Sequence, residues 1–216
     1  MKKWFWSFLA GLCGVLVMSI IIWVDGGSES FVQYKWWWLC AGFVGGVAIW
    51  LIHIREYFTE IDIGSRNKWP ANVLSNFHDN PFYFDGIYCA SIEGLLQAFK
   101  TKYANEQIRL CGLPGPEAQE AGREYNDWKD SQYLHWNGKS YERGSVEYWE
   151  LLLRVFDIEN MSSDKIAGLL ATGNRKLVHS IGKNDKTQTI LTEDEFCRLL
   201  TIARAKLKEK GLAYIG

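Results

Sequence analysis

The sequence predicts an α+β domain that is mostly helical and contains a small β-hairpin, preceded by two transmembrane helices. The composition changes along the chain, because seven of the eleven Trp precede residue 51 whereas nearly all charged residues follow residue 54. In the later part, apolar residues recur at helical spacing in several segments. These segments do not alternate with strands as in a doubly wound sheet, and no G-x-G-x-x-G or P-loop motif is present.

The overall composition narrows the function classes. A length of 216 residues permits one ordinary domain and a smaller part, and a net charge of -1 leaves no basic surface of the kind that general nucleic-acid binding requires. The five cysteines include no CxxC pair and no histidine at zinc-ligand spacing. We therefore expect reduced thiols, no metal site and no cofactor.

The first part of the chain contains two charge-free runs. Residues 4–24 form a run of 21 residues, which at about 1.5 Å per residue can cross a hydrocarbon core of about 30 Å. Residues 36–54 form the second run, with three tryptophans at its start. The connection is too short for a domain. We predict a transmembrane helical hairpin in residues 1–54, a linker at 55–68 and a folded domain at 69–216.

The distribution of basic residues predicts the orientation of this hairpin. Lys2 and Lys3 precede the first run and Arg55 follows the second, against a single lysine, Lys35, in the connection. By the positive-inside rule, both termini and the folded domain face the cytoplasm, which makes this a two-pass protein of the inner or cell membrane. The alternative is a cleaved signal peptide. Three observations argue against a signal peptide: the first run exceeds its usual apolar region of about 7–15 residues, no A-x-A cleavage site follows, and a second run is present.

The folded domain begins with a turn, a hairpin and a helix. Residues 82–84 and 87–89 flank Asp85-Gly86, a strong signal for a type I′ turn. Ser91 is placed to cap the next helix, whose apolar side recurs at helical spacing. We expect further helices at 117–129, 146–156, 164–170 and 193–210, the last opening with Thr192 and Glu195 as a capping box and ending near Gly211. Short strands are expected at 177–180 and 189–191.

Three polar residues share one face of the Ser91 helix. Glu93, Gln97 and Lys100 are separated by four and three residues, so they project together. One interpretation is a solvated ladder of surface residues. The other is a pocket, because the helix starts directly after a hairpin and a Leu-Ser-Asn-Phe turn, where polar groups can converge.

Several ordered motifs resemble a known family. Leu74-Ser-Asn-Phe77 and the Asp-Gly hairpin are followed by Ser-x-Glu and Gln-Ala-x-Lys on the next helix. Gly122-Arg123 with Asp127-Trp128 follows, and then Leu-Leu-Ala-Thr-Gly at 169–173 with Leu-Val at 177–178. Across residues 74–207 this order resembles the NADAR family, the YbiA-like N-glycosidases.

The resemblance implies a YbiA-like α+β fold and cleavage of an N-glycosidic bond. The substrate classes that it implies are ADP-ribosylated guanine and riboflavin-pathway intermediates, in which the bond joins ADP-ribose or a ribose phosphate to a base or amine. Glu93 matches the family's catalytic carboxylate, and Lys100 matches a lysine thought to form a Schiff base with the sugar. The predicted substrate-binding residues are Ser75, Asn76, Phe77, Gln97, Arg123, Trp128 and Asp185.

These residue types fit that chemistry. A partly neutral lysine amine can attack the anomeric carbon, and a carboxylic acid can move the proton. A close ion pair between Glu93 and Lys100 would keep the amine protonated, so the two should meet through substrate or water. Asn76 and Gln97 are suited to hydrogen bonds with sugar or base, and Arg123 to a phosphate. Phe77 can stack on a base, although core packing is the alternative for Phe77 and for Trp128.

The sequence also departs from the family pattern. Gly94 stands where the family has a histidine after its glutamate, and the Asp-x-x-Trp-Gly segment is missing. Asp185 is the best match to that aspartate. His179 lies near the expected pocket wall, although a lone histidine is more often structural.

We therefore predict a membrane-tethered N-glycosidase that acts on an ADP-ribosyl or phosphoribosyl compound. The first alternative is a binding or sensor module that holds an ADP-ribose-type ligand at the membrane without turnover. The second is a domain that only makes protein contacts.

Overall fold

The computed structural model describes residues 42, 45–47, 51 and 60–211. The chain divides into two compact units, Met1–Thr59 and Glu60–Gly216, and the fold described below is that of the second unit. Apart from residues 42, 45–47 and 51, the predicted spans 4–24 and 36–54 lie outside the described residues. Within the described part of the chain, no helix has both the length and the apolar character needed to cross a membrane.

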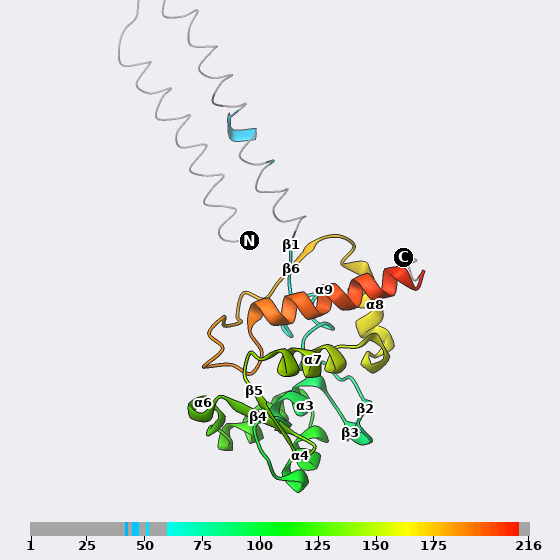
Figure 1. Ribbon diagram of the computed structural model, residues 1–216. Coiled ribbons are helices and arrows are strands. Elements are labelled where there is room, and N and C mark those ends of the chain that lie inside the picture. Colours follow the sequence, from blue (N-terminus) through cyan, green and yellow to red (C-terminus); the bar gives the residue numbers. More distant parts are fainter. Residues whose placement is uncertain (1–41, 43–44, 48–50, 52–59, 212–216) are drawn as a thin grey trace, which may run out of the picture. The chain divides into compact units, whose positions relative to one another are not determined.

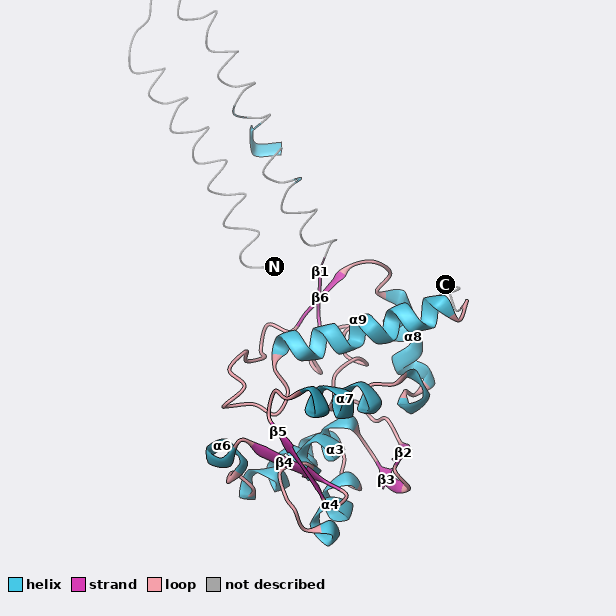
Figure 2. Ribbon diagram, viewed as in Figure 1, coloured by secondary structure: helices cyan, strands magenta, loops and turns pink. Residues whose placement is uncertain are grey.

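The second unit is a mixed α+β fold, mostly helical with small two-stranded sheets (Figures 1 and 2). The strands are β1 (Glu60–Asp62), β2 (Phe82–Phe84), β3 (Ile87–Cys89), β4 (Tyr133–Trp136), β5 (Lys139–Glu142) and β6 (Lys176–Val178). The α-helices are α3 (Ile92–Ala98), α4 (Ala104–Cys111), α5 (Gly115–Ala121), α6 (Trp128–Ser131), α7 (Val146–Val155), α8 (Ser163–Ala171) and α9 (Glu193–Glu209). Two 3₁₀ turns, η1 (Gly122–Glu124) and η2 (Ile158–Asn160), complete the set.

The predicted Asp-Gly hairpin is confirmed. Strands β2 and β3 pair antiparallel with Phe84 opposite Ile87, and Asp85 and Gly86 have φ values of 49° and 81°. Positive φ at both central positions is what a type I′ turn requires. The Asp85 carboxylate also accepts a hydrogen bond from Trp136 Nε1 at 2.8 Å, which ties this hairpin to β4.

A second hairpin, β4–β5, was not predicted. It turns at Asn137 and Gly138, whose φ values are 48° and 77°. Asn-Gly is as strong a turn signal as Asp-Gly. The sequence therefore carries a local signal for this hairpin at residues 137–138.

The parallel pair β1–β6 corrects two expectations. Residues 60–62 belong to the predicted linker but form β1, because Ile61 and Ile63 alternate with Asp62 and are buried. The strand expected at 177–180 is observed as β6, which starts one residue earlier and ends two residues earlier. Residues 189–191 are not a strand, because Thr189 Oγ1 donates to the Leu191 carbonyl at 2.8 Å and closes a local turn.

The helices confirm most of the predicted capping. Ser91 accepts from Gly94 N at 3.0 Å at the start of α3, and Thr192 and Glu195 form the predicted capping box of α9. The single helix expected at 117–129 is wrong, because α5, η1 and α6 replace it. The Asn126 side chain donates to the Arg123 carbonyl at 2.5 Å, a local bond that competes with helix continuation. Helix α4 was not predicted.

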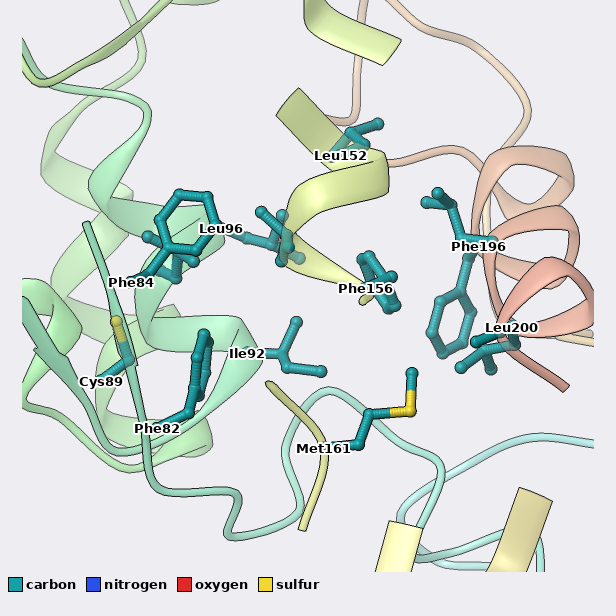
Figure 3. Packing of buried hydrophobic residues seen from close by; sticks show 14 of the residues in the cluster. Phe82, Phe84, Cys89, Ile92, Leu96, Leu152, Phe156, Met161, Phe196 and Leu200 are labelled. Carbon is teal, nitrogen blue, oxygen red and sulfur yellow. The ribbon is translucent and has the colours of Figure 1, made fainter. Parts of the chain in front are cut away.

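One hydrophobic core joins these elements (Figure 3). Figure 3 shows Phe82 and Cys89 of the first hairpin on one side, Ile92 and Leu96 of α3 beside them, and Phe156 opposite Phe196 of α9. Because α3 lies in this core, the polar groups on it have fixed positions.

Candidate active site

The start of α3 is attached to the Ser-Asn-Phe turn. The Glu93 amide donates to the Asn76 carbonyl at 3.1 Å. Within the turn, Ser75 Oγ accepts from the Phe77 amide at 3.2 Å. The turn and the first residues of the helix therefore form one rigid unit that carries Asn76 and Glu93 together.

Glu93 is a buried carboxyl group. Its exposed fraction is 8%, and Gln97 Nε2 donates to its Oε1 at 2.7 Å. Burial raises the pKa of Glu93, while the bond from Gln97 and the charge of Lys100 oppose that shift. The carboxyl can therefore hold a proton at a higher pH than a surface glutamate does.

Lys100 is half-buried one turn beyond Gln97. Its Nζ donates to the Gly122 carbonyl at 3.2 Å. Burial lowers the pKa of Lys100 to about 8, with Lys129 lowering it further and Glu93 opposing the shift. A measurable fraction of this amine is therefore neutral near neutral pH, as an attacking nucleophile must be.

The three polar residues predicted on the Ser91 helix are not a solvated ladder. Helix α3 ends at Ala98, so Lys100 lies in the turn after it and not on the helix. Glu93 and Gln97 are buried, and Lys100 is only partly exposed. Each of the two charged groups bonds to a different neighbour, and no ion pair joins Glu93 to Lys100 among the described residues. Their catalytic roles stay predictions.

Helix α5 and the η1 turn after it each pack against this region through a glycine. A Cβ on Gly115 would lie 2.4 Å from the Phe77 Cα, and a Cβ on Gly122 would lie 1.9 Å from Gln97 Oε1. At 115 the contact is with backbone, so a side chain there would push α5 away from the turn. At 122 the contact is with the Gln97 side chain, which a side chain at that position would displace. The start of α5 thus contacts the Ser-Asn-Phe turn, and η1 contacts Gln97 and Lys100.

Close packing against α4 explains why a glycine occupies position 94. A Cβ at this position would lie 2.8 Å from the Leu110 carbonyl oxygen and 2.9 Å from that of Cys111. Helix α3 therefore passes directly over the end of α4. A histidine, which the resembled family has here, does not fit this packing.

Several buried polar atoms near the site lack a hydrogen-bond partner within the described part of the chain. Two of them are acceptors on Asn76 (Oδ1) and Gln97 (Oε1), and a third is the donor Nε1 of Trp128. Asn72 Oδ1 is the fourth. Because buried polar groups are nearly always paired, unpaired acceptors beside Glu93 point to a ligand that donates hydrogen bonds.

Arg123 lies at the edge of a surface pocket of about 580 Å³. The pocket is lined by Leu113, Glu117, Glu120, Ala121, Arg123 and Glu124, so it includes neither Glu93 nor Lys100. Arg123 is exposed and pairs with Glu120 at 2.7 Å. Three carboxylates in this pocket disfavour an anionic group, so Arg123 would have to leave Glu120 to bind a phosphate.

Residues 68–205 match the protein family described as "Bacteriophage protein GP30.3". The chain belongs to this family. A relative is an uncharacterized 17.1 kDa protein of Enterobacteria phage T4 from the Gp30-rIII intergenic region, 38% identical over 151 residues, 69% of this chain and 99% of that protein. The NMR structure of the E. coli protein YbiA matches with 22% identity and a TM-score of 0.47, covering 71% of this chain and 87% of that chain.

The match to the GP30.3 family includes every predicted site residue, but the fold does not join all of them. Asp185 is exposed on the loop before α9, where its carboxylate accepts hydrogen bonds from the Thr187 amide and hydroxyl, which lower its pKa. No contact connects it to Glu93 or Lys100 among the described residues. His179 is structural, since its Nδ1 lies 2.7 Å from the Ile63 carbonyl and its ring packs against Phe196.

Two charged residues of this GP30.3 family domain were missed. Lys129 lies close enough to lower the pKa of Lys100. Lys165 on α8 is buried and donates to the turn that carries Asn76. The sequence does not indicate that either lysine lies near the site, because each stands next to an aspartate as surface lysines commonly do.

Proposed function

We propose that the folded domain is an N-glycosidase that cleaves the bond between a ribose carbon and a base nitrogen. The substrate is an ADP-ribosyl or phosphoribosyl compound, such as ADP-ribosylated guanine or a riboflavin-pathway intermediate. The proposal rests on the ordered motifs that resemble the NADAR family and on one observation above all. Glu93 on α3 and Lys100 in the turn just after it are close enough for each charge to affect the pKa of the other, and burial shifts both pKa values. Among the described residues each bonds to a different neighbour, and no ion pair joins them.

The proposed chemistry uses the two groups in sequence. The neutral Lys100 amine attacks the anomeric carbon, the carbon–nitrogen bond breaks, and Glu93 gives its proton to the departing base. Opening of the sugar ring leaves an iminium between that carbon and Nζ. Water then adds, Glu93 takes a proton back, and the free sugar and the lysine are restored.

The unpaired acceptors suit the substrate. Ribose hydroxyls and base amino groups are donors, so Asn76 Oδ1 and Gln97 Oε1 can receive them without losing an existing bond. This arrangement favours a donor-rich sugar over an apolar ligand.

The experiment that tests this function is base release from defined compounds. Purified protein is incubated with ADP-ribosylated guanosine, NAD-derived nucleotides and riboflavin-pathway intermediates, and free base is measured. Borohydride added during turnover should trap a covalent adduct whose mass equals the sugar-phosphate part. The absence of release from all of these compounds contradicts the proposal.

The alternative is a module that binds an ADP-ribose-type ligand without turnover. The unpaired acceptors Asn76 Oδ1 and Gln97 Oε1 support it, because they suit a donor-rich ligand whether or not the ligand is cleaved. A rise in melting temperature with ADP-ribose, without base release, would support the binding module over the enzyme.

We also propose that residues 4–24 and 36–54 attach the domain to the cytoplasmic face of a membrane. This proposal is supported by the two charge-free runs and the excess of basic residues at their outer ends. Its test is described in the Discussion.

A further inference from the structure

Helix α8 carries a fully buried lysine. Lys165 is 1% exposed, and no carboxylate pairs with it within the described residues. Burial lowers its pKa to about 7. A buried cation without a counter-charge is unfavourable, so its contacts must explain what it does.

Those contacts are two backbone carbonyls, one in the Ser-Asn-Phe turn and one just before it. Lys165 Nζ donates to the Ser75 oxygen at 2.6 Å and to the Val73 oxygen at 3.0 Å. One helical turn later, a Cβ on Gly168 would lie 2.4 Å from Val73 Cγ2. The helix therefore touches this segment with its backbone and holds it with one side chain.

The held turn leads directly to Glu93. Ser75 is followed by Asn76, whose carbonyl accepts from the Glu93 amide and whose Oδ1 is unpaired. Lys165 is thus linked to the Glu93 amide by two hydrogen bonds, one to the Ser75 carbonyl and one at the Asn76 carbonyl. If the Ser75 carbonyl were released, Asn76 and Glu93 would lose a common support.

A second buried side chain connects the start of α8 to this part of the chain, but it does not contact the Ser-Asn-Phe turn. Asn80 is fully buried, its Nδ2 donates to the Asn160 carbonyl at 2.8 Å, and its Oδ1 accepts from the Ser162 amide at 2.7 Å. Asn80 lies after the turn and contacts neither Asn76 nor Glu93 in these bonds. It is therefore a matched control for loss of an anchor between α8 and this segment.

We propose that Lys165 is a positioning residue of the site: by holding the Val73 and Ser75 carbonyls, it sets where Asn76 and Glu93 meet the substrate. This inference rests on the proposed function. A purely structural lysine would affect stability alone, whereas a positioning residue affects catalysis in molecules that remain folded.

The test compares Lys165→Met with Asn80→Ala in the full chain. Kinetic constants are measured on ADP-ribosylated guanosine, or on whichever compound the wild type cleaves, at equal distance below each melting temperature. We expect Lys165→Met to lower kcat/KM by about 10–100-fold, with a higher KM, as for a small misplacement of binding groups. Asn80→Ala should keep kcat/KM close to the wild type. Equal kcat/KM values for the two variants overturn the inference.

A second variant keeps the inference testable if Lys165→Met does not fold. Gly168→Ala retains the lysine but pushes Val73 away from α8, so it should raise KM in the same direction. An unchanged KM overturns the inference. If the wild type cleaves nothing, dissociation constants for ADP-ribose replace kcat/KM with the same expectations. A wild type that neither cleaves nor binds refutes the proposed function together with this inference, whereas an active wild type with unaffected variants refutes this inference alone.

Discussion

At the scale of single residues, the site depends on how burial changes the pKa of two groups, Glu93 on α3 and Lys100 in the turn after that helix. Lys100 follows Glu93 by seven positions, and the Gln97 side chain between them donates to the Glu93 carboxyl. The lysine bonds instead to the Gly122 carbonyl. The amine is thus kept near the carboxyl without the direct ion pair that would hold it protonated.

The first prediction concerns the chemical roles of these two groups. Lys100→Arg keeps a charge but cannot present a neutral amine, so turnover and borohydride trapping should both be lost while the fold remains. Glu93→Gln should slow turnover by about 10²–10⁴-fold, the usual effect of losing a positioned proton donor. Normal cleavage by Lys100→Arg would exclude the covalent mechanism.

The second prediction concerns the pH dependence of turnover. Because the pKa of Lys100 is lowered to about 8, the rate should rise with pH up to that value as the amine loses its proton. Lys129 contributes to the shift, so Lys129→Gln should raise the pKa and move the rising limb to higher pH. The pH profiles of kcat/KM for the two proteins check this, and superimposable profiles would contradict it.

The third prediction concerns stability and Lys165. Its pKa is near 10.5 in the unfolded chain and about 7 in the fold. Between these values the unfolded chain binds more protons, so stability should increase as pH rises from about 7 to 10.5. The slope from this group is at most about 1.4 kcal/mol per pH unit. Lys100 contributes with the same sign, so the measured quantity is the reduction of the slope in Lys165→Met. Equal slopes would show that Lys165 is neutral in both states or charged in both.

At the scale of elements, glycines set how closely α3 packs. Gly94→Ala would place a Cβ within 3.0 Å of three backbone oxygens, those of Leu110, Cys111 and Leu113. We expect it to destabilise the domain by about 1–3 kcal/mol, although alanine has the higher helix propensity. Gly112→Ala is the control, because its Cβ would meet only ordinary contacts at 3.7 Å. Chemical denaturation measures both variants, and equal midpoints would contradict the packing argument.

Local signals explain which elements the sequence predicted. The Asp85-Gly86 turn, the Ser91 cap and the Thr192–Glu195 capping box each depend on residues adjacent in the chain, and all three are present in the fold. The packing of α5 and η1 on the Ser-Asn-Phe turn and on Gln97 was not predictable in this way. It depends on Gly115 and Gly122 meeting Phe77 and Gln97 across the fold.

The same limit applies to Lys165 and to β1. Lys165 becomes a buried donor only because α8 packs on the Ser-Asn-Phe turn, which lies about 90 positions earlier in the chain. Strand β1 pairs with β6, more than 110 positions later in the chain, so the sequence predicted a linker at this position. Contacts between distant segments have no local signature in one sequence.

At the scale of the whole molecule, the question is how the chain is attached. The GP30.3 family match covers residues 68–205, and the 38% identical phage protein is covered over 99% of its length by 69% of this chain. The family unit therefore accounts for a domain, and both charge-free runs lie before the family match.

The last prediction is that the two charge-free runs hold the full chain in membranes, whereas a fragment starting at Glu60 stays in solution. An arginine at the centre of a span disfavours insertion by about 2.5–3.5 kcal/mol. The double variant Gly14→Arg with Gly45→Arg should therefore release the full chain from carbonate-washed membranes. Gln33→Arg in the connection adds a charge outside both runs and should leave the protein membrane-bound. Recovery of the unaltered full chain in the soluble fraction without detergent would show instead that these runs pack against protein.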